Sequence, residues 1–167
     1  ESTILVMGGG LGLGALEEVL LQLDTITGNQ RIVVVAGRND ALRKELQSLS
    51  RSLRHTVSIL GYTQRIPELM ANADLLVTKP GALTCSEAMV TGLPMVLVNA
   101  IPGQEEDNAH YLHNHHAALW VQDETLLAQV VSRLLSDPSS LATMRYQAQQ
   151  LGRPDAAQQI VRQLSGM

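Results

Sequence analysis

Short runs of Val, Ile and Leu alternate with amphipathic segments along the chain, and this alternation limits the fold more than any other feature of the sequence. The apolar runs predict strands at residues 4–7, 31–36, 56–60, 73–78, 95–98 and 118–121. The amphipathic segments predict helices at residues 13–22, 40–53, 66–71, 84–91, 105–113, 124–136, 139–151 and 155–164. Near-continuous apolar strands are typical of a sheet covered on both faces. The sequence therefore predicts an α/β fold with a doubly wound, Rossmann-like parallel sheet of about six strands.

The composition favours one domain in a reducing compartment. The 167 residues are 45% hydrophobic and contain no linker-like stretch, so we expect a single domain over residues 1–167. A formal net charge of −4 gives no basic field for a nucleic-acid backbone, and nucleic acid is not expected as a partner. The single cysteine and the lack of a long apolar run predict a cytoplasmic location. The start at Glu1, without an initiator Met or a leader, indicates a piece of a longer protein.

The run from Lys79 to Ala88 places a turn of small residues between a buried strand and a helix. Pro80 and Gly81 cannot continue the strand, and a helix is expected from Leu83 or Thr84. The first N–H groups of a helix have no intrahelical acceptor and carry the positive end of the helix dipole, so this turn is a candidate anion site. Glu87 follows one turn later, where a carboxylate supports the helix dipole or accepts hydrogen bonds from the hydroxyls of a ligand.

Five glycines in residues 8–14 follow the first predicted strand. Their spacing does not match a dinucleotide fingerprint, because the third glycine would fall on Leu13 and no acidic residue follows Gly37-Arg38. A Walker phosphate loop would need a lysine that this loop lacks, which argues against ATP hydrolysis. Two interpretations remain: the backbone approaches a ligand or a facing domain closely, or the glycines only make a tight strand-to-helix turn.

Two further polar turns precede helices. Residues 61–65 expose backbone that can pair with the edge of a flat base, although an ordinary loop explains them equally well. In residues 101–108, Gln104 and Glu105 are placed to bond sugar hydroxyls, or they belong to a solvated helix start that Asp107 or Asn108 caps or charges.

Histidines and the cysteine give weaker signals. Neither a cysteine nor a well-spaced carboxylate completes a tetrahedral metal site, so we expect no metal and assign the imidazoles to favourable positions near a helix C-terminus. The histidines concerned are His110, His113, His115 and His116. Cys85 lies beside a helix N-terminus, which can lower the pKa of a thiol, but no partner histidine is evident and packing is the favoured role.

Three segments together resemble one family: the glycine-rich turn 8–14, the turn 81–87, and residues 102–105 with Asn108. The chain resembles the C-terminal, nucleotide-sugar-binding half of glycosyltransferase family 28. That family includes the N-acetylglucosaminyltransferase of peptidoglycan synthesis, monogalactosyldiacylglycerol synthase and the bacterial diacylglycerol glucosyltransferases. The triple glycine and the Gly-Gln-Glu segment are most similar to the glycolipid synthases, although Leu11 stands where plant-type galactolipid synthases tend to have an acidic residue.

The resemblance implies a GT-B enzyme whose N-terminal domain, absent from this chain, holds the acceptor and the general base. It implies inverting transfer from a UDP-sugar substrate, with no cofactor, to a lipid acceptor, expected to be diacylglycerol. It also implies peripheral association of the full-length protein with the inner face of the membrane. The implied site residues are Tyr62 and Thr63 for uracil; Gly81, Ala82, Leu83 and Thr84 for the diphosphate; Glu87 for the ribose; Gln104 and Glu105 for the hexose; and the glycine-rich loop of Gly8, Gly9, Gly10 and Gly12.

Two other hypotheses stay open on the sequence. A nucleotide-sugar epimerase of the non-hydrolysing type shares a two-domain architecture, and a non-catalytic interaction module would place the glycine loop against a partner protein. The sequence also does not select the hexose that is transferred.

Overall fold

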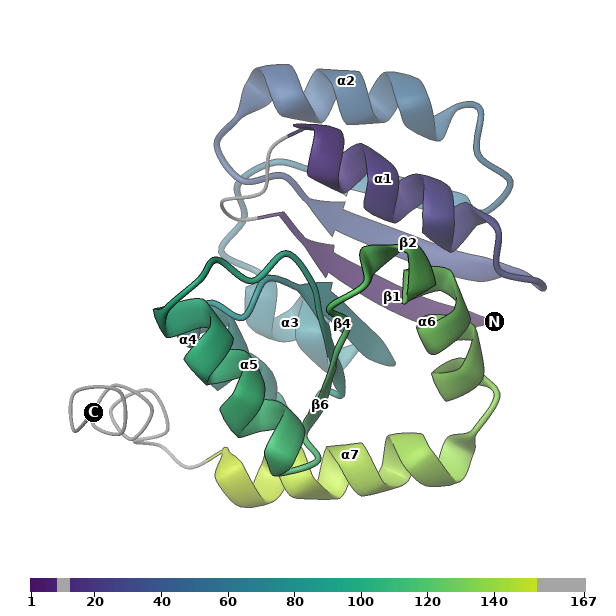
Figure 1. Cartoon of the computed structure of the whole chain (residues 1–167). Helices are drawn as coiled ribbons and strands as arrows, with labels where there is room; N and C mark the ends of the chain where they lie inside the picture. The colour runs from purple at the N-terminus through teal and green to yellow at the C-terminus, as the bar shows by residue number, and fades with distance from the viewer. Residues whose placement is uncertain (9–12, 153–167) are drawn as a thin grey trace.

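The computed structural model describes residues 1–8 and 13–152, which include six parallel strands in one sheet (Figure 1). The strand order is β3-β2-β1-β4-β5-β6. The strands are β1 (Ser2–Met7), β2 (Gln30–Val35), β3 (Thr56–Leu60), β4 (Leu75–Thr78), β5 (Met95–Leu97) and β6 (Ala118–Trp120). This confirms the predicted doubly wound parallel sheet.

Helices lie between the strands and after the last strand, as the sequence predicts. They are α1 (Leu13–Asp24), α2 (Asp40–Ser50), α3 (Ile66–Ala71), α4 (Ala82–Thr91), α5 (Gln104–Asn114), η1 (Glu124–Leu126, a 3-10 turn), α6 (Leu127–Leu135) and α7 (Pro138–Leu151). The single helix predicted for 124–136 is wrong in its first turn. Asp123 accepts hydrogen bonds from the backbone N–H and the hydroxyl of Thr125, at 3.1 and 2.6 Å, and this cap favours the tighter 3-10 turn. The helix predicted at 155–164 lies outside the described residues.

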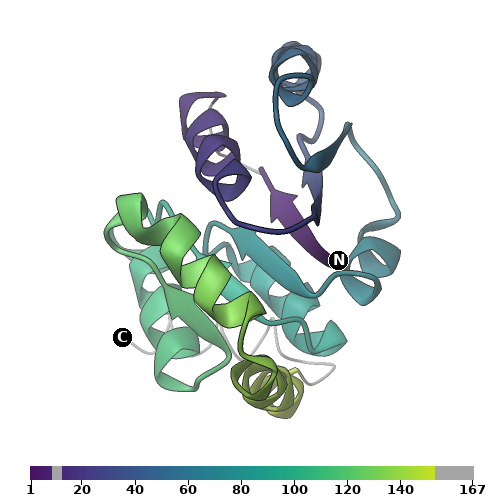
Figure 2. The ribbon, with the colours of Figure 1, turned by 90° about the vertical axis from the view of Figure 1, so that its right-hand side faces the viewer.

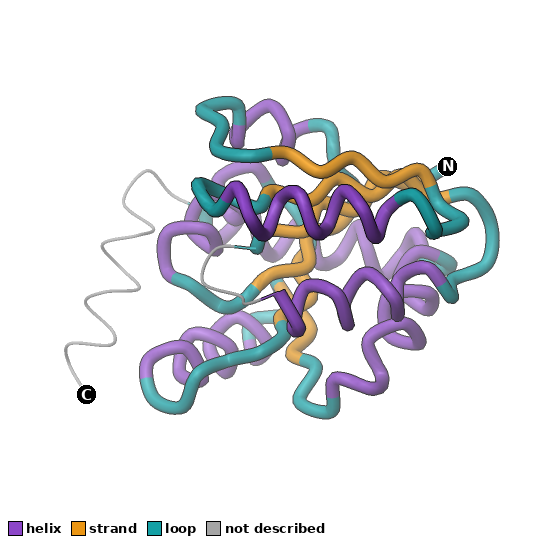
Figure 3. Tube along the Cα trace, turned by 90° about the horizontal axis from the view of Figure 1, so that it is seen from above, coloured by secondary structure: helices purple, strands orange, loops and turns teal. Residues whose placement is uncertain are grey.

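Two apolar layers enclose the sheet, which Figures 2 and 3 show with helices on both sides. Successive strand residues point to opposite faces, so Ile4 and Val6 join the layer under α1, α2 and α6, whereas Leu5 joins the layer under α3, α4 and α5. Helix α7 contributes Met144 to the first layer and Ala148 to the second. No helix in the described part of the chain combines the length and apolar character needed to cross a bilayer.

The strand order reverses direction between β1 and β4. From β1 the chain moves outward to β2 and β3, and it then returns to place β4 on the other side of β1. Met7, at the end of β1, is paired with Val35 of β2 and with Thr78 of β4. The segments that leave β1 and β4 therefore start side by side at the carboxyl edge of the sheet, where ligands bind in doubly wound folds.

Candidate functional site

The turn after β4 presents the start of helix α4 at this edge. Lys79 and Pro80 are buried, and Gly81 is the N-cap residue with φ −72° and ψ 139°. Helix α4 begins at Ala82, slightly earlier than the sequence predicts, and none of the side chains that the structure describes caps it. The first-turn N–H groups of such a helix have no intrahelical acceptor, so this turn stays a candidate anion site.

Lys79 turns inward and pairs with Glu105. Its Nζ lies 3.2 Å from Glu105 Oε1, and the two side chains are only 10% and 22% exposed. Glu105 Oε2 accepts a hydrogen bond from the backbone N–H of Ile101 at 2.8 Å. The Lys79 charge is therefore compensated within the chain, and both carboxylate oxygens of Glu105 are oriented. A carboxylate has about four acceptor positions, so Glu105 can still accept from a hydroxyl.

A second link joins the same two segments. Asn108, on α5, is 3% exposed and donates from Nδ2 to the carbonyl oxygen of Pro80 at 2.9 Å. Asn108 is the fifth residue of α5 and does not cap the helix. Its bond and the Lys79–Glu105 pair hold α5 against the turn that starts α4.

The start of α5 is a second uncapped helix N-terminus at the carboxyl edge. Gly103 occupies the N-cap position with φ 101°, a left-handed conformation that favours glycine, and no side chain within residues 1–8 and 13–152 caps the helix. Gln104, the first helical residue, is exposed, and Glu105 follows it. The two residues expected to contact a hexose thus lie beside the turn expected to hold a diphosphate.

Glu87 lies on the second turn of α4 and is exposed. In the described part of the chain its carboxylate takes part in no ion pair and no side-chain hydrogen bond; the Thr91 hydroxyl bonds only its backbone carbonyl, at 2.9 Å. The carboxylate is therefore available to a ligand at the helix start.

The loop after β3 carries an exposed aromatic ring. Tyr62 is 56% exposed, and the guanidinium carbon of Arg38 lies 4.0 Å from its ring centroid. The Thr63 hydroxyl accepts from the backbone N–H of Arg65 at 3.0 Å, which fixes the loop. Our sequence reasoning missed Arg38, although its position one residue past Gly37, at the end of a strand that neighbours β3, was a usable signal.

Part of the glycine-rich loop is described. Gly8 donates from its backbone N–H to Val35 at 3.0 Å, and an added Cβ would lie 2.8 Å from Leu16 Cδ1 and 3.1 Å from Val35 O. Gly8 is therefore a tight strand-to-helix contact, which is one of the two interpretations of this loop. Gly9, Gly10 and Gly12 lie outside the described residues.

Cys85 packs in the core and is not an activated thiol. It is completely buried, and burial, followed by the nearby charge of Glu105, raises its pKa to about 12. The lowering of the thiol pKa expected from the helix N-terminus is overridden because the thiolate would have to form without water.

Within residues 1–8 and 13–152, no three His, Cys, Asp or Glu side chains gather as a metal site would require.

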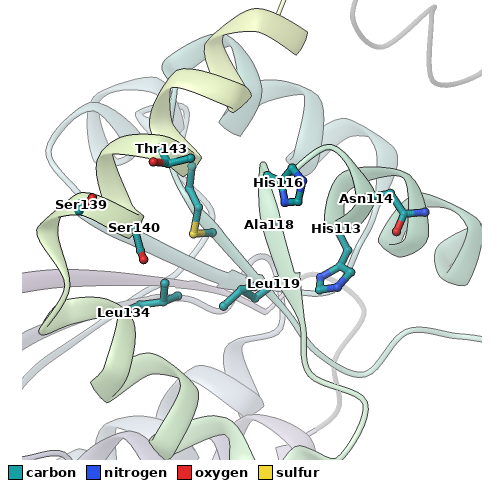
Figure 4. Close-up of a pocket in the computed structure, with 10 residues that line it drawn as sticks. His113, Asn114, His116, Ala118, Leu119, Leu134, Ser139, Ser140 and Thr143 are labelled. Atoms are coloured by element: carbon teal, nitrogen blue, oxygen red, sulfur yellow. The ribbon is translucent and has the colours of Figure 1, made fainter.

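Two hollows flank strand β6. The one in Figure 4, about 420 Å³, lies at the amino end of β6, away from the predicted site. It is lined by residues of α5, β6, α6 and α7, among them His113 and Met144, and by His116 in the turn before β6. The other, about 360 Å³, lies beyond the carboxyl ends of β5 and β6 and is lined by Glu106, Trp120 and Glu124 among others. Only the second adjoins the start of α5.

The family model described as "Glycosyltransferase family 28 C-terminal domain" matches residues 3–160. The chain belongs to this family. Two relatives are processive diacylglycerol beta-glucosyltransferases, 31% identical over 161 residues in Bacillus pumilus and 33% identical over 162 residues in a Bacillus cereus strain. Each match covers 96% of this chain and 42% of the relative, so the chain spans less than half the length of these proteins.

Solved structures agree with this family 28 assignment. MurG of Acinetobacter baumannii is 27% identical with a TM-score of 0.76, and the match covers 99% of this chain and 50% of MurG. HepE of Anabaena, solved with UDP and glucose, shares the fold at 22% identity and a TM-score of 0.73, over 98% of this chain and 48% of HepE. The chain thus has the fold of the C-terminal domain of a GT-B glycosyltransferase, as the resemblance predicts.

Proposed function

We propose that this chain is the donor-binding half of an inverting UDP-sugar hexosyltransferase that acts on a lipid acceptor, diacylglycerol. The observation that carries the proposal is that the starts of α4 and α5, which no described side chain caps, are joined at the carboxyl edge of the sheet, beside its reversal point. The names of the Bacillus relatives support a glucose donor and a diacylglycerol acceptor.

In this proposal each end of the nucleotide sugar has its own contacts. The turn from Gly81 to Thr84, with the first N–H groups of α4, binds the diphosphate, and Glu87 accepts hydrogen bonds from the ribose hydroxyls. Gln104 and Glu105 bind the hexose hydroxyls. The Lys79–Glu105 pair, at 3.2 Å, keeps the α5 start in position for this contact.

The reaction proposed is a single displacement. The acceptor hydroxyl attacks the anomeric carbon, the bond from that carbon to the diphosphate oxygen breaks, and UDP leaves. Negative charge grows on the diphosphate during this step, and N–H donors already oriented at a helix start stabilise it. The proposal assigns this stabilisation to α4 rather than to a metal or a cofactor. The base that takes the acceptor proton is assigned to the other half of the enzyme, so the chain alone binds the donor without transferring the sugar.

Titration calorimetry with UDP and UDP-glucose tests donor binding. We expect saturable binding that persists in EDTA, and Glu87→Ala should weaken it by about 1.5 to 3 kcal/mol, the range for hydrogen bonds to a charged group. Glu45→Ala is the matched control, because Glu45 is an exposed helical glutamate on α2, away from this site. Absence of any heat at millimolar UDP would contradict the proposal, and full affinity in Glu87→Ala would remove Glu87 from the site.

A second measurement addresses the reaction. With UDP-glucose and vesicles that contain diacylglycerol, the chain alone should release no UDP and form no glycolipid. Conversion of UDP-N-acetylglucosamine into its 2-epimer without an acceptor would instead favour the epimerase hypothesis.

A further inference from the structure

Arg38 and Tyr62 lie in the loops that follow two neighbouring strands, β2 and β3, and these strands end at the same level of the sheet. Val35 of β2 is paired with Leu60 of β3, and the Ala36 backbone N–H donates to the carbonyl oxygen of Leu60 at 2.8 Å, which extends the pairing by one residue. Gly37 then adopts φ 69°, a left-handed turn that glycine makes without strain. Two short loops thereby bring the two side chains into contact at the carboxyl edge.

Folding stability does not account for the contact between Arg38 and Tyr62. Both side chains are exposed, and the guanidinium carbon lies 4.0 Å from the Tyr62 ring centroid. An exposed cation–π contact adds little to folding stability. None of the ion pairs found within residues 1–8 and 13–152 involves Arg38, whereas nearby Arg43 pairs with Asp40 at 3.5 Å. The Arg38 guanidinium is therefore held by the Tyr62 ring and has no acidic partner in the described chain. It is available to bind a ligand.

The position of the Arg38–Tyr62 contact relative to helix α4 fits the base end of a nucleotide. Strands β2 and β3 lie two and three places from β4 in the sheet. At the usual spacing between strands, this separates the Arg38–Tyr62 contact from the α4 start by about 10 to 14 Å. A nucleoside diphosphate whose phosphates occupy the α4 start can extend its base over this span.

We propose that Arg38 is a specificity-determining residue that reads the nucleotide base, with Tyr62 holding its guanidinium in place. This inference rests on the proposed donor function of the chain. A guanidinium has five N–H donors, which lie in its own plane, and no acceptor. It can therefore donate to the O4 carbonyl of uracil while one face lies on the Tyr62 ring. Cytosine carries an amino donor at the equivalent position, so the same contact disfavours a cytidine nucleotide.

Calorimetric titrations with UDP, CDP and inorganic pyrophosphate test this assignment. The wild-type chain should prefer UDP to CDP. Arg38→Ala should weaken UDP binding about tenfold, as the loss of one charged hydrogen bond does, and should reduce the preference over CDP by a similar factor. Pyrophosphate binding should not change. Arg38→Lys should recover only part of the preference, because lysine keeps the charge but not the planar set of donors.

Lys44→Ala is the control, since it removes an exposed cation from the adjacent helix α2. The Lys44→Ala variant should bind UDP, CDP and pyrophosphate with the same affinities as the wild type. Unchanged UDP affinity and an unchanged UDP-to-CDP ratio in Arg38→Ala would overturn the base-reading role alone. Equal weakening of UDP, CDP and pyrophosphate would also overturn it and would indicate a phosphate contact. Absence of UDP binding by the wild-type chain would instead overturn the proposed donor function, and the base-reading role with it.

Discussion

Asn108 donates its side-chain amide to the carbonyl oxygen of Pro80 at 2.9 Å, between residues 28 positions apart. The bond is buried and joins helix α5 to the turn that starts α4. Together with the Lys79–Glu105 pair, this polar side chain in a mostly apolar layer therefore sets the relative position of the two helix starts.

Replacing Asn108 by Ala should lower the free energy of unfolding by about 1 to 3 kcal/mol, because the buried Pro80 carbonyl loses its donor. Denaturant unfolding of wild type and variant measures this loss. Asn114→Ala, at the exposed end of the same helix, should stay within about 0.5 kcal/mol of the wild type, as surface substitutions usually do. Equal stabilities for Asn108→Ala and the wild type would contradict the structural role of this bond.

The Lys79–Glu105 pair should show coupling in a double-mutant cycle. Lys79→Met leaves a half-buried carboxylate without its cation and should destabilise the fold by about 1 to 3 kcal/mol, less than the loss at a fully buried pair. Glu105→Gln should also destabilise it. The double variant should be more stable than the sum of the single losses predicts, by about 0.5 to 3 kcal/mol. Strict additivity in denaturant unfolding would mean that the two charges do not interact.

The sheet and its topology follow from the sequence because apolar runs of four to six residues alternate with amphipathic segments. Residues 4–7, for example, predict a strand buried on both faces, and Ile4, Leu5 and Val6 are each at most 1% exposed. The turn at Gly81 was also predictable, since Pro80 and Gly81 end a strand in any context. These features depend on local sequence and on the periods of helix and strand.

The pairs that shape the site were not predictable in the same way. Lys79 and Glu105 are 26 positions apart, and Arg38 and Tyr62 are 24 apart. Each pair meets only after the strands have taken their places, so the local sequence around one partner does not identify the other. The inward turn of Lys79 and the burial of Asn108 likewise depend on packing between β4 and α5. Glu105 and Tyr62 were therefore expected in the site, but their pairing with Lys79 and Arg38 was not.

Gly8 and Gly14 should respond oppositely to the same substitution. A Cβ at Gly8 would lie 2.8 Å from Leu16 Cδ1 and 3.1 Å from Val35 O, so Gly8→Ala should cost about 1 to 3 kcal/mol of stability. A Cβ at Gly14 meets nothing within 4 Å in the described structure, and Gly14 lies in helix α1. Gly14→Ala should therefore stabilise the fold by about 0.5 to 1 kcal/mol. Thermal unfolding of both variants gives the comparison; equal effects would contradict the tight contact at Gly8.

Cys85 should be unreactive in the native chain. Burial raises its pKa to about 12, so at pH 8 the native thiol is neutral and shielded, and a colourimetric thiol reagent should modify it only after denaturant is added. Prompt reaction of the native chain would contradict the burial of the thiol.

The same pKa shift predicts a pH dependence of stability. The folded pKa lies above the ordinary value of about 8.5, so the unfolded state releases the thiol proton first as the pH rises. The stabilisation linked to the neutral thiol is complete below about pH 8.5 and should be lost progressively between there and about pH 12. Cys85→Ala lacks this group but keeps every Lys and Tyr that also titrates, so its unfolding free energy should fall less steeply over the same interval. Parallel pH profiles for the two proteins, measured by denaturant unfolding, would mean that the thiol ionises equally easily in the folded and unfolded chain.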